Sequence, residues 1–156
     1  MHTRIQKSIS LCALAFLVAA PSAWADNFRS APAPAVYTQE CAGCHMAYPA
    51  SLLPKASWSR IMTGLDKHYG SDATLDEASL KQISAYLQAN AATNRKVSQE
   101  PPKDRITQSA WFVRKHDEVS AATFKRASIK SASNCMACHP AADKGDFNED
   151  RVKIPK

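Results

Sequence analysis

The chain has 156 residues, a formal net charge of +6 and 45% hydrophobic residues. It begins with basic residues, continues with an apolar run over residues 9–20 and then reads Ala23-Trp24-Ala25, which is the pattern of a secretory signal peptide over residues 1–25. The apolar run is shorter than the ~20 residues that a membrane-spanning helix needs, and no later stretch approaches that length. The sequence therefore predicts a soluble, exported protein in the periplasm.

Basic residues are unevenly spread along the predicted mature chain. Without residues 1–25, 18 Lys and Arg stand against 14 Asp and Glu, and nine of these basic residues lie between Arg95 and Lys130. A net charge this small does not indicate binding to nucleic acid, so no nucleic-acid partner is expected. The basic stretch is either a solvated face or a surface that steers an acidic protein partner.

Apolar spacing predicts helices and no convincing strand, which gives an all-α fold class. After an extended arm, a short helix is expected from near Tyr37, and the next helix is expected over residues 57–69, closed by Gly70. The residues on one face of that second helix are Trp58, Ile61, Met62, Leu65 and His68. A third helix is expected over residues 76–90, capped by Thr74 or Asp76. Its inward residues are Leu80, Ile83 and Leu87.

A polar stretch with Pro101-Pro102 divides the mature chain. We therefore expect a first domain over residues 26–95, a linker over residues 96–103 and a second domain over residues 104–156. In the second domain a helix is predicted over residues 107–119, with His116 on its apolar face, and a shorter one over residues 121–129. Residues 141–156 should form an irregular tail that wraps around a bound group.

Four cysteines remain once Cys12 is set aside within the signal peptide. They form two Cys-x-x-Cys-His units, namely Cys41, Cys44 and His45, and Cys135, Cys138 and His139. This pentapeptide is the attachment signal for c-type haem: each thiol forms a thioether with one haem vinyl group, and the histidine becomes the proximal iron ligand. Two disulfides, a zinc site or a thioredoxin-like pair fit less well, because a histidine follows both pairs and the pairs lie too far apart for a zinc ribbon. The sequence thus predicts two covalently bound haem c groups.

The sixth coordination site of each haem iron needs a further ligand if the haem is to be closed to small molecules. Only His68 and His116 remain after the two proximal histidines and His2 of the signal peptide are removed, and one lies in each half of the chain. We expect His68 and His116 to be the distal ligands. Met62 is an alternative to His68, and a crossed pairing of the distal histidines with the two haems stays open.

Several stretches beyond the haem motifs resemble the dihaem cytochrome c family of proteobacteria. They are Met46-Ala47-Tyr48-Pro49, Ser51-Leu52-Leu53-Pro54, Gly64-Leu65-Asp66-Lys67-His68-Tyr69-Gly70, Gly145-Asp146-Phe147 and Arg151-Val152-Lys153-Ile154-Pro155. The resemblance implies a class I cytochrome c-like N-terminal haem domain, a less regular C-terminal haem-binding segment and bis-histidine ligation. It also implies electron transfer to a small high-spin cytochrome c, with a membrane cytochrome b as the source of electrons.

Electron transfer without catalysis is the function that these residues favour. The alternatives are a small dihaem peroxidase or reductase, and a gas-responsive sensor in which His68 or Met62 leaves the iron. Both alternatives need an iron site that is open or easily vacated. Two spare histidines for two haems argue against such a site.

Overall fold

The computed structural model describes residues 28, 30–95 and 97–156. The predicted signal peptide over residues 1–25 lies outside the described residues. Within the described ranges, no helix is long and apolar enough to cross a membrane.

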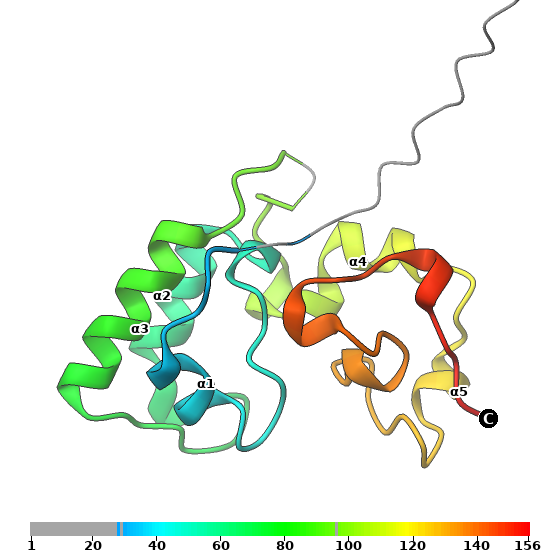
Figure 1. Ribbon diagram of the computed structural model, residues 1–156, viewed down its shortest axis with the longest axis horizontal. Coiled ribbons are helices and arrows are strands. Elements are labelled where there is room, and N and C mark those ends of the chain that lie inside the picture. The colour runs from blue at the N-terminus through cyan, green and yellow to red at the C-terminus, as the bar shows by residue number, and fades with distance from the viewer. Residues whose placement is uncertain (1–27, 29, 96) are drawn as a thin grey trace, which may run out of the picture.

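Five short α-helices form the regular part of the described chain, which contains no strand and only an isolated bridge between His68 and Ser71. They are α1 (Ala35–Cys41), α2 (Lys55–Thr63), α3 (Glu77–Asn90), α4 (Ala110–Lys115) and α5 (Ala121–Phe124). Single 3-10 turns occur at Ala50–Leu52, Leu65–Lys67, Pro102–Asp104, Ile106–Gln108, Cys135–Ala137, Ala142–Lys144 and Glu149–Arg151. Figure 1 shows α1, α2 and α3 on one side, with α4, α5 and the C-terminal tail on the other. The all-α prediction is confirmed.

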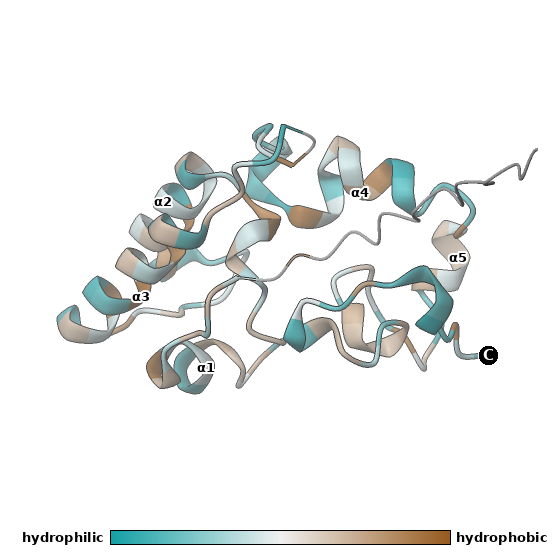
Figure 2. Cartoon of the chain, turned by 45° about the horizontal axis from the view of Figure 1, so that its top comes forward, coloured by the Kyte–Doolittle hydropathy of each residue, from teal (hydrophilic) through white to brown (hydrophobic). Residues whose placement is uncertain are grey.

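Helix α3 forms as its sequence predicts. The Asp76 carboxylate accepts hydrogen bonds from the backbone N–H groups of Ala78 and Ser79, which satisfies two donors that have no partner inside the helix. Ile83 and Leu87 lie one helical turn apart and are almost completely buried. The same separation of polar and apolar faces gives α2 and α3 their alternating bands in Figure 2.

The predicted helix over residues 57–69 is wrong in its second half. Helix α2 ends at Thr63, and Gly64 follows it with φ −120° and ψ 30°, outside the helical region. A 3-10 turn and the His68–Ser71 bridge then replace the helix. His68 therefore does not share a helix face with Met62, because a glycine ends the helix four residues before the histidine.

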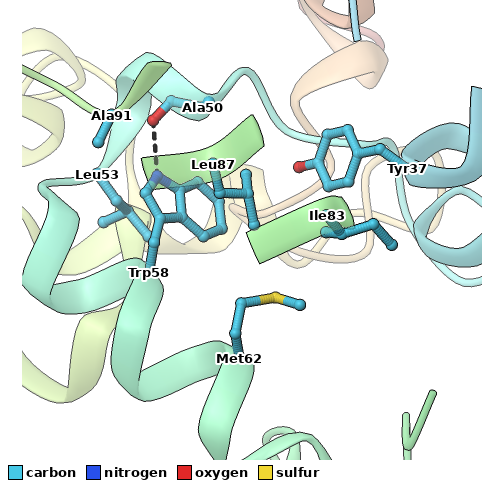
Figure 3. Packing of buried hydrophobic residues seen from close by; sticks show 8 residues of the cluster. All are labelled: Tyr37, Ala50, Leu53, Trp58, Met62, Ile83, Leu87 and Ala91. Carbon is cyan, nitrogen blue, oxygen red and sulfur yellow. Dashed lines mark hydrogen bonds between the residues drawn. The ribbon is translucent and has the colours of Figure 1, made fainter. Parts of the chain in front are cut away.

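Eight buried residues make the core between α1, α2 and α3 (Figure 3). They are Tyr37, Ala50, Leu53, Trp58, Met62, Ile83, Leu87 and Ala91. The Trp58 indole N–H donates to the Ala50 carbonyl at 2.6 Å, so its polar atom is satisfied inside the cluster. This core ties α2 to the turn that follows the first haem motif.

A second buried cluster joins segments that are far apart in sequence. Its members are Phe28, Leu52, Ala92, Val97, Trp111 and Phe112. The rings of Phe28 and Trp111 meet edge to face, with centroids 4.6 Å apart. Residues before the first haem motif thus pack with α4, which belongs to the second half of the chain.

The two predicted helices of the second half are shorter in the structure. Helix α4 begins after Ser109, whose hydroxyl accepts from the Phe112 N–H at 3.0 Å, and it ends before His116. Helix α5 has only four residues. Both helices contribute side chains to the wall of a cavity that is described below.

The segment after α3 is fixed to the rest of the molecule in spite of its polar sequence. Ala92 and Val97 are buried, and the Ala92 N–H donates to the Leu53 carbonyl at 2.8 Å. The division into domains over residues 26–95 and 104–156 stays a prediction. Ala92 and Val97 are thus fixed in the second buried cluster, whereas residues 93–95 are exposed.

Candidate haem-binding sites

The first haem motif follows directly from α1. Cys41 is the last residue of the helix and is partly buried, whereas Cys44 and His45 are exposed. Burial, followed by the nearby Glu40 charge, raises the pKa of the Cys41 thiol to about 11. A redox-active dithiol needs a lowered thiol pKa, so this environment does not favour thioredoxin-like chemistry.

His45 faces His68 across the first site. Their ring centroids are 6.1 Å apart and their planes differ by 34°. The His45 Nδ1 lies 2.7 Å from the Met46 carbonyl, so an Nδ1–H donor leaves Nε2 free to bind a metal. Burial lowers the pKa of His68, with smaller contributions from His45 and Arg105, which favours the neutral imidazole that a metal requires.

The second site repeats this pairing with different segments. The rings of His116 and His139 also have centroids 6.1 Å apart, but their planes differ by 77°. The His116 Nδ1 lies 2.9 Å from the Phe112 carbonyl, and its ring stacks on the Phe112 ring at 4.0 Å. Burial and the neighbouring His116 lower the pKa of His139. Both imidazoles of this pair are thus held next to apolar surface.

A cavity of about 420 Å³ contains both histidines and both cysteines of the second site. Its apolar walls come from α4, α5, the segments beside α5 and the tail, and include Trp111, Phe112, Val119, Phe124, Ile129, Phe147, Val152 and Ile154. The Lys153 N–H donates to the Cys138 carbonyl at 2.9 Å, which fastens the tail over the motif. Residues 147–150, 152 and 154 of the tail line this cavity, which agrees with the expected irregular tail, while the wrapping of a haem stays a prediction.

The cysteines of the second motif lie on the wall of this cavity. Burial raises the pKa of Cys135 to about 11 and also raises that of Cys138. The four cysteines of the described chain form no disulfide. This part of the chain also holds no cluster of three or more His, Cys, Asp or Glu that suits a further metal ion.

Tyr48 connects the two sites. It was not among the site residues expected from the sequence, which were all cysteines, histidines or a methionine. Its ring stacks on the His45 ring with centroids 4.8 Å apart. Its hydroxyl donates to the Ser133 carbonyl at 2.8 Å, two residues before Cys135. The available sequence signal was the Met46-Ala47-Tyr48-Pro49 stretch, which carried part of the family resemblance but gave no indication of a contact 85 residues away.

Comparison with known proteins agrees with this arrangement. The family model described as dihaem cytochrome c matches residues 37–147. The chain belongs to the dihaem cytochrome c family. The X-ray structure of a dihaem cytochrome c from Shewanella baltica OS155 is 42% identical, with a TM-score of 0.68, and the match covers 78% of this chain and 92% of that one. No curated protein matches the sequence.

A second related structure supports the same membership. The crystal structure of a dihaem cytochrome c purified from Rhodobacter sphaeroides is 48% identical, with a TM-score of 0.64. The match covers 74% of this chain and 98% of that one. As a dihaem cytochrome c, this chain carries two covalently bound c-type haems and has an electron-carrier role.

The residues of this dihaem cytochrome c fit two such groups. A metal–imidazole bond is about 2 Å long, and the ring centre lies roughly 1 Å further on, so two imidazoles that share one iron have centroids about 6 Å apart. The observed separation is 6.1 Å in both pairs. Each site thus presents two histidines at the spacing of axial ligands, with a Cys-x-x-Cys pair beside them.

Proposed function

We propose that this chain is a periplasmic electron carrier in which both haem irons are closed by two histidines. His45 and His68 ligate the first iron, and His139 and His116 ligate the second. The cysteines that attach the haems are Cys41 and Cys44 for the first, and Cys135 and Cys138 for the second. The observation that carries the proposal is the 6.1 Å separation of the rings within each pair.

The surroundings of the histidines support a closed site. Nδ1 of His45 and of His116 each lies within hydrogen-bond distance of a backbone carbonyl, which orients the ring and directs Nε2 away from it. Met62, the alternative ligand of the first haem, is buried in the core cluster with Trp58 and Ile83. A ligand role for Met62 would require it to leave that packing, so His68 is the better donor.

The contact made by Tyr48 supports a relay between the two sites. Haem supplies one-electron redox chemistry, and the protein sets the potential, the exposure and the docking surface. Tyr48 stacks on His45 and reaches Ser133 beside the second motif, so the two sites are joined through one side chain. The chain carries electrons from one haem to the other and has no catalytic centre of its own.

Redox partners lie on either side of this relay. We assign a membrane cytochrome b as the donor and a small high-spin cytochrome c as the acceptor, on the basis of the family resemblance. Bis-histidine ligation favours a lower potential than His/Met ligation, which suits a donor to another haem protein. The basic residues from Arg95 to Lys130 provide charge that steers an acidic partner.

Spectra of the purified holoprotein test the ligand set. In the oxidised state we expect two low-spin haems and no Met-to-iron charge-transfer band, and in the reduced state no immediate shift when carbon monoxide is added. The reason is that two imidazoles fill both axial positions of each iron. A Met-to-iron charge-transfer band would mean that Met62, and not His68, ligates the first haem iron. A high-spin signal with a carbon monoxide shift would contradict the closed sites and favour an enzyme or a gas sensor.

Electron paramagnetic resonance adds a sharper criterion to these spectra. Nearly parallel imidazole planes separate the two iron π orbitals in energy, whereas crossed planes leave them close together. The planes differ by 34° at the first site and by 77° at the second. We therefore expect one rhombic low-spin signal and one highly anisotropic low-spin signal, in equal amounts. Two identical signals would contradict the assigned geometry.

Rapid mixing tests the proposed acceptor. The reduced protein is mixed with an oxidised small high-spin cytochrome c from the same source, and haem oxidation is followed by absorbance. We expect a second-order reaction whose rate falls as salt is added, because charge steering is screened. Mixing with a basic cytochrome of similar size is the control, and it should react more slowly at low salt. Absence of transfer at every salt concentration would rule out this partner.

A further inference from the structure

Backbone strain is concentrated beside His68. The non-glycine residues with positive φ in the described chain are Tyr69, Lys103, Asp104 and Lys130. The φ angles of the first three are 51°, 55° and 54°. Such angles are unfavourable for residues with a Cβ and persist only where surrounding contacts enforce them. Three of the four residues belong to a single contact, between the His68 loop and the segment that leads to α4.

Tyr69 makes this contact with both its hydroxyl and its ring. The hydroxyl lies 3.2 Å from the Lys103 carbonyl and 3.0 Å from the Asp104 carbonyl, so it donates into a strained turn. The Arg105 guanidinium carbon lies 4.2 Å above the centre of the Tyr69 ring, in a cation–π arrangement. The turn at residues 103–105 therefore holds a tyrosine that is otherwise half-exposed.

Arg60 of α2 fixes the same turn from the other side. Its guanidinium donates to the Asp104 carboxylate at 2.9 and 2.6 Å, and to Glu100 at 2.7 Å. The Asp104 side chain is only 16% exposed, and the hydrogen bonds from Arg60 lower its pKa. A bidentate arginine–carboxylate pair restrains orientation as well as distance. The turn is thus a fixed support and not a mobile loop that happens to touch Tyr69.

His68 depends on Tyr69 for its position. The two residues are adjacent, and their rings meet edge to face with centroids 4.9 Å apart. His68 lies beyond the end of α2 and follows the short 3-10 turn Leu65–Lys67, so no α-helix holds it. Its loop is closed by short-range backbone hydrogen bonds, from Lys67 N to Gly64 O, from His68 N to Leu65 O, from Ser71 N to His68 O and from Ala73 N to Leu65 O. The contact of Tyr69 with residues 103–105 adds a restraint on the His68 loop from a distant segment, which α2 cannot provide because it ends at Thr63.

We propose that Tyr69 is a positioning residue that holds His68 on the first haem iron, with the turn at residues 103–105 as its support. The segment between the two halves of the chain thereby keeps the first haem closed to external ligands. This inference rests on the proposed role of His68 as a distal ligand. If Tyr69 only stabilised the fold, its hydroxyl would not affect the rate at which external ligands bind the first haem.

Carbon monoxide binding to the reduced holoprotein tests the proposal. Tyr69→Phe removes the hydroxyl and keeps the ring, and we expect carbon monoxide to bind the first haem three- to tenfold faster, about the effect of one lost hydrogen bond. Tyr86→Phe is the matched control, because the Tyr86 hydroxyl also donates to a backbone carbonyl, that of Ala31. Tyr86→Phe should bind carbon monoxide as slowly as the unaltered protein.

Two further variants distinguish a failure of the Tyr69 positioning role from a failure of the His68 ligand role. Arg105→Gln removes the cation above the Tyr69 ring and should also speed carbon monoxide binding, by a smaller factor. His68→Ala should open the first haem fully. If His68→Ala opens the haem but Tyr69→Phe and Arg105→Gln bind at the unaltered rate, the positioning role is overturned. If the unaltered protein already binds at the His68→Ala rate, the ligand role of His68 fails instead.

Discussion

Replacing His116 with alanine is expected to open one haem of the protein to carbon monoxide and to leave the other closed. His116 is the partner of His139 at 6.1 Å, and its loss leaves the second iron with one protein ligand. The variant should rapidly bind one carbon monoxide per chain, where the unaltered protein binds it only slowly. Difference spectra of the reduced protein measure the stoichiometry, and the oxidised protein should gain one high-spin signal.

The identity of the opened haem decides how the ligands are paired. His116→Ala should abolish the highly anisotropic signal and keep the rhombic one, whereas His68→Ala should do the reverse. If His116→Ala abolished the rhombic signal instead, the distal histidines would be paired with the haems in the crossed arrangement. His116→Met is the conservative control: it should keep the site closed and raise the potential of that haem, by part of the roughly 0.8 V range that axial ligands span.

Replacing both Cys135 and Cys138 with serine is expected to give a protein with one haem and a disordered second half. The second half has helices of only six and four residues around a cavity of about 420 Å³. The lining is largely apolar, so without the haem these side chains would be left facing water, which is unfavourable. The walls therefore cannot keep their places without the group they enclose.

Mass spectrometry and limited proteolysis measure this outcome. The intact mass should correspond to one haem, and protease should remove residues 110–156 while the first half stays protected. A Ser131→Ala, Ser133→Ala variant changes two positions just before the same motif and should keep both haems. Two haems in the cysteine variant would show that attachment lies elsewhere. One haem with a protease-resistant second half would mean that this half folds without its haem.

The sequence predicted correctly those features that are determined by residues close together in the chain. Helix α3 follows from its apolar spacing and from the Asp76 cap, both of which are local. The two haem motifs are local as well, because a Cys-x-x-Cys-His unit binds its haem within five residues. The all-α class followed from the same patterns.

The errors arose where distant contacts decide the outcome. The spacing of Met62 and His68 suits one helix, but Gly64 ends α2 and the histidine takes its place from a loop. The role of Tyr69 depends on a turn 34 residues later, and that of Tyr48 on Ser133. No periodicity within either segment indicates such a partner. Val97 likewise gives little signal in a polar stretch, yet it is buried against the second cluster.

The packing of Phe28 sets an order of assembly for the chain. Phe28 precedes the first haem motif by 13 residues, yet its ring contacts Trp111 and Phe147, and its N–H donates to the Gly145 carbonyl. The segment around Phe28 is synthesised early, but it cannot form these contacts until residues 111–147 have been synthesised. Contacts with such large sequence separation form late in folding, because the closing loop is costly in entropy. We therefore expect the segment around Phe28 to dock late in folding, after α4 and the residues around Gly145 have taken their places.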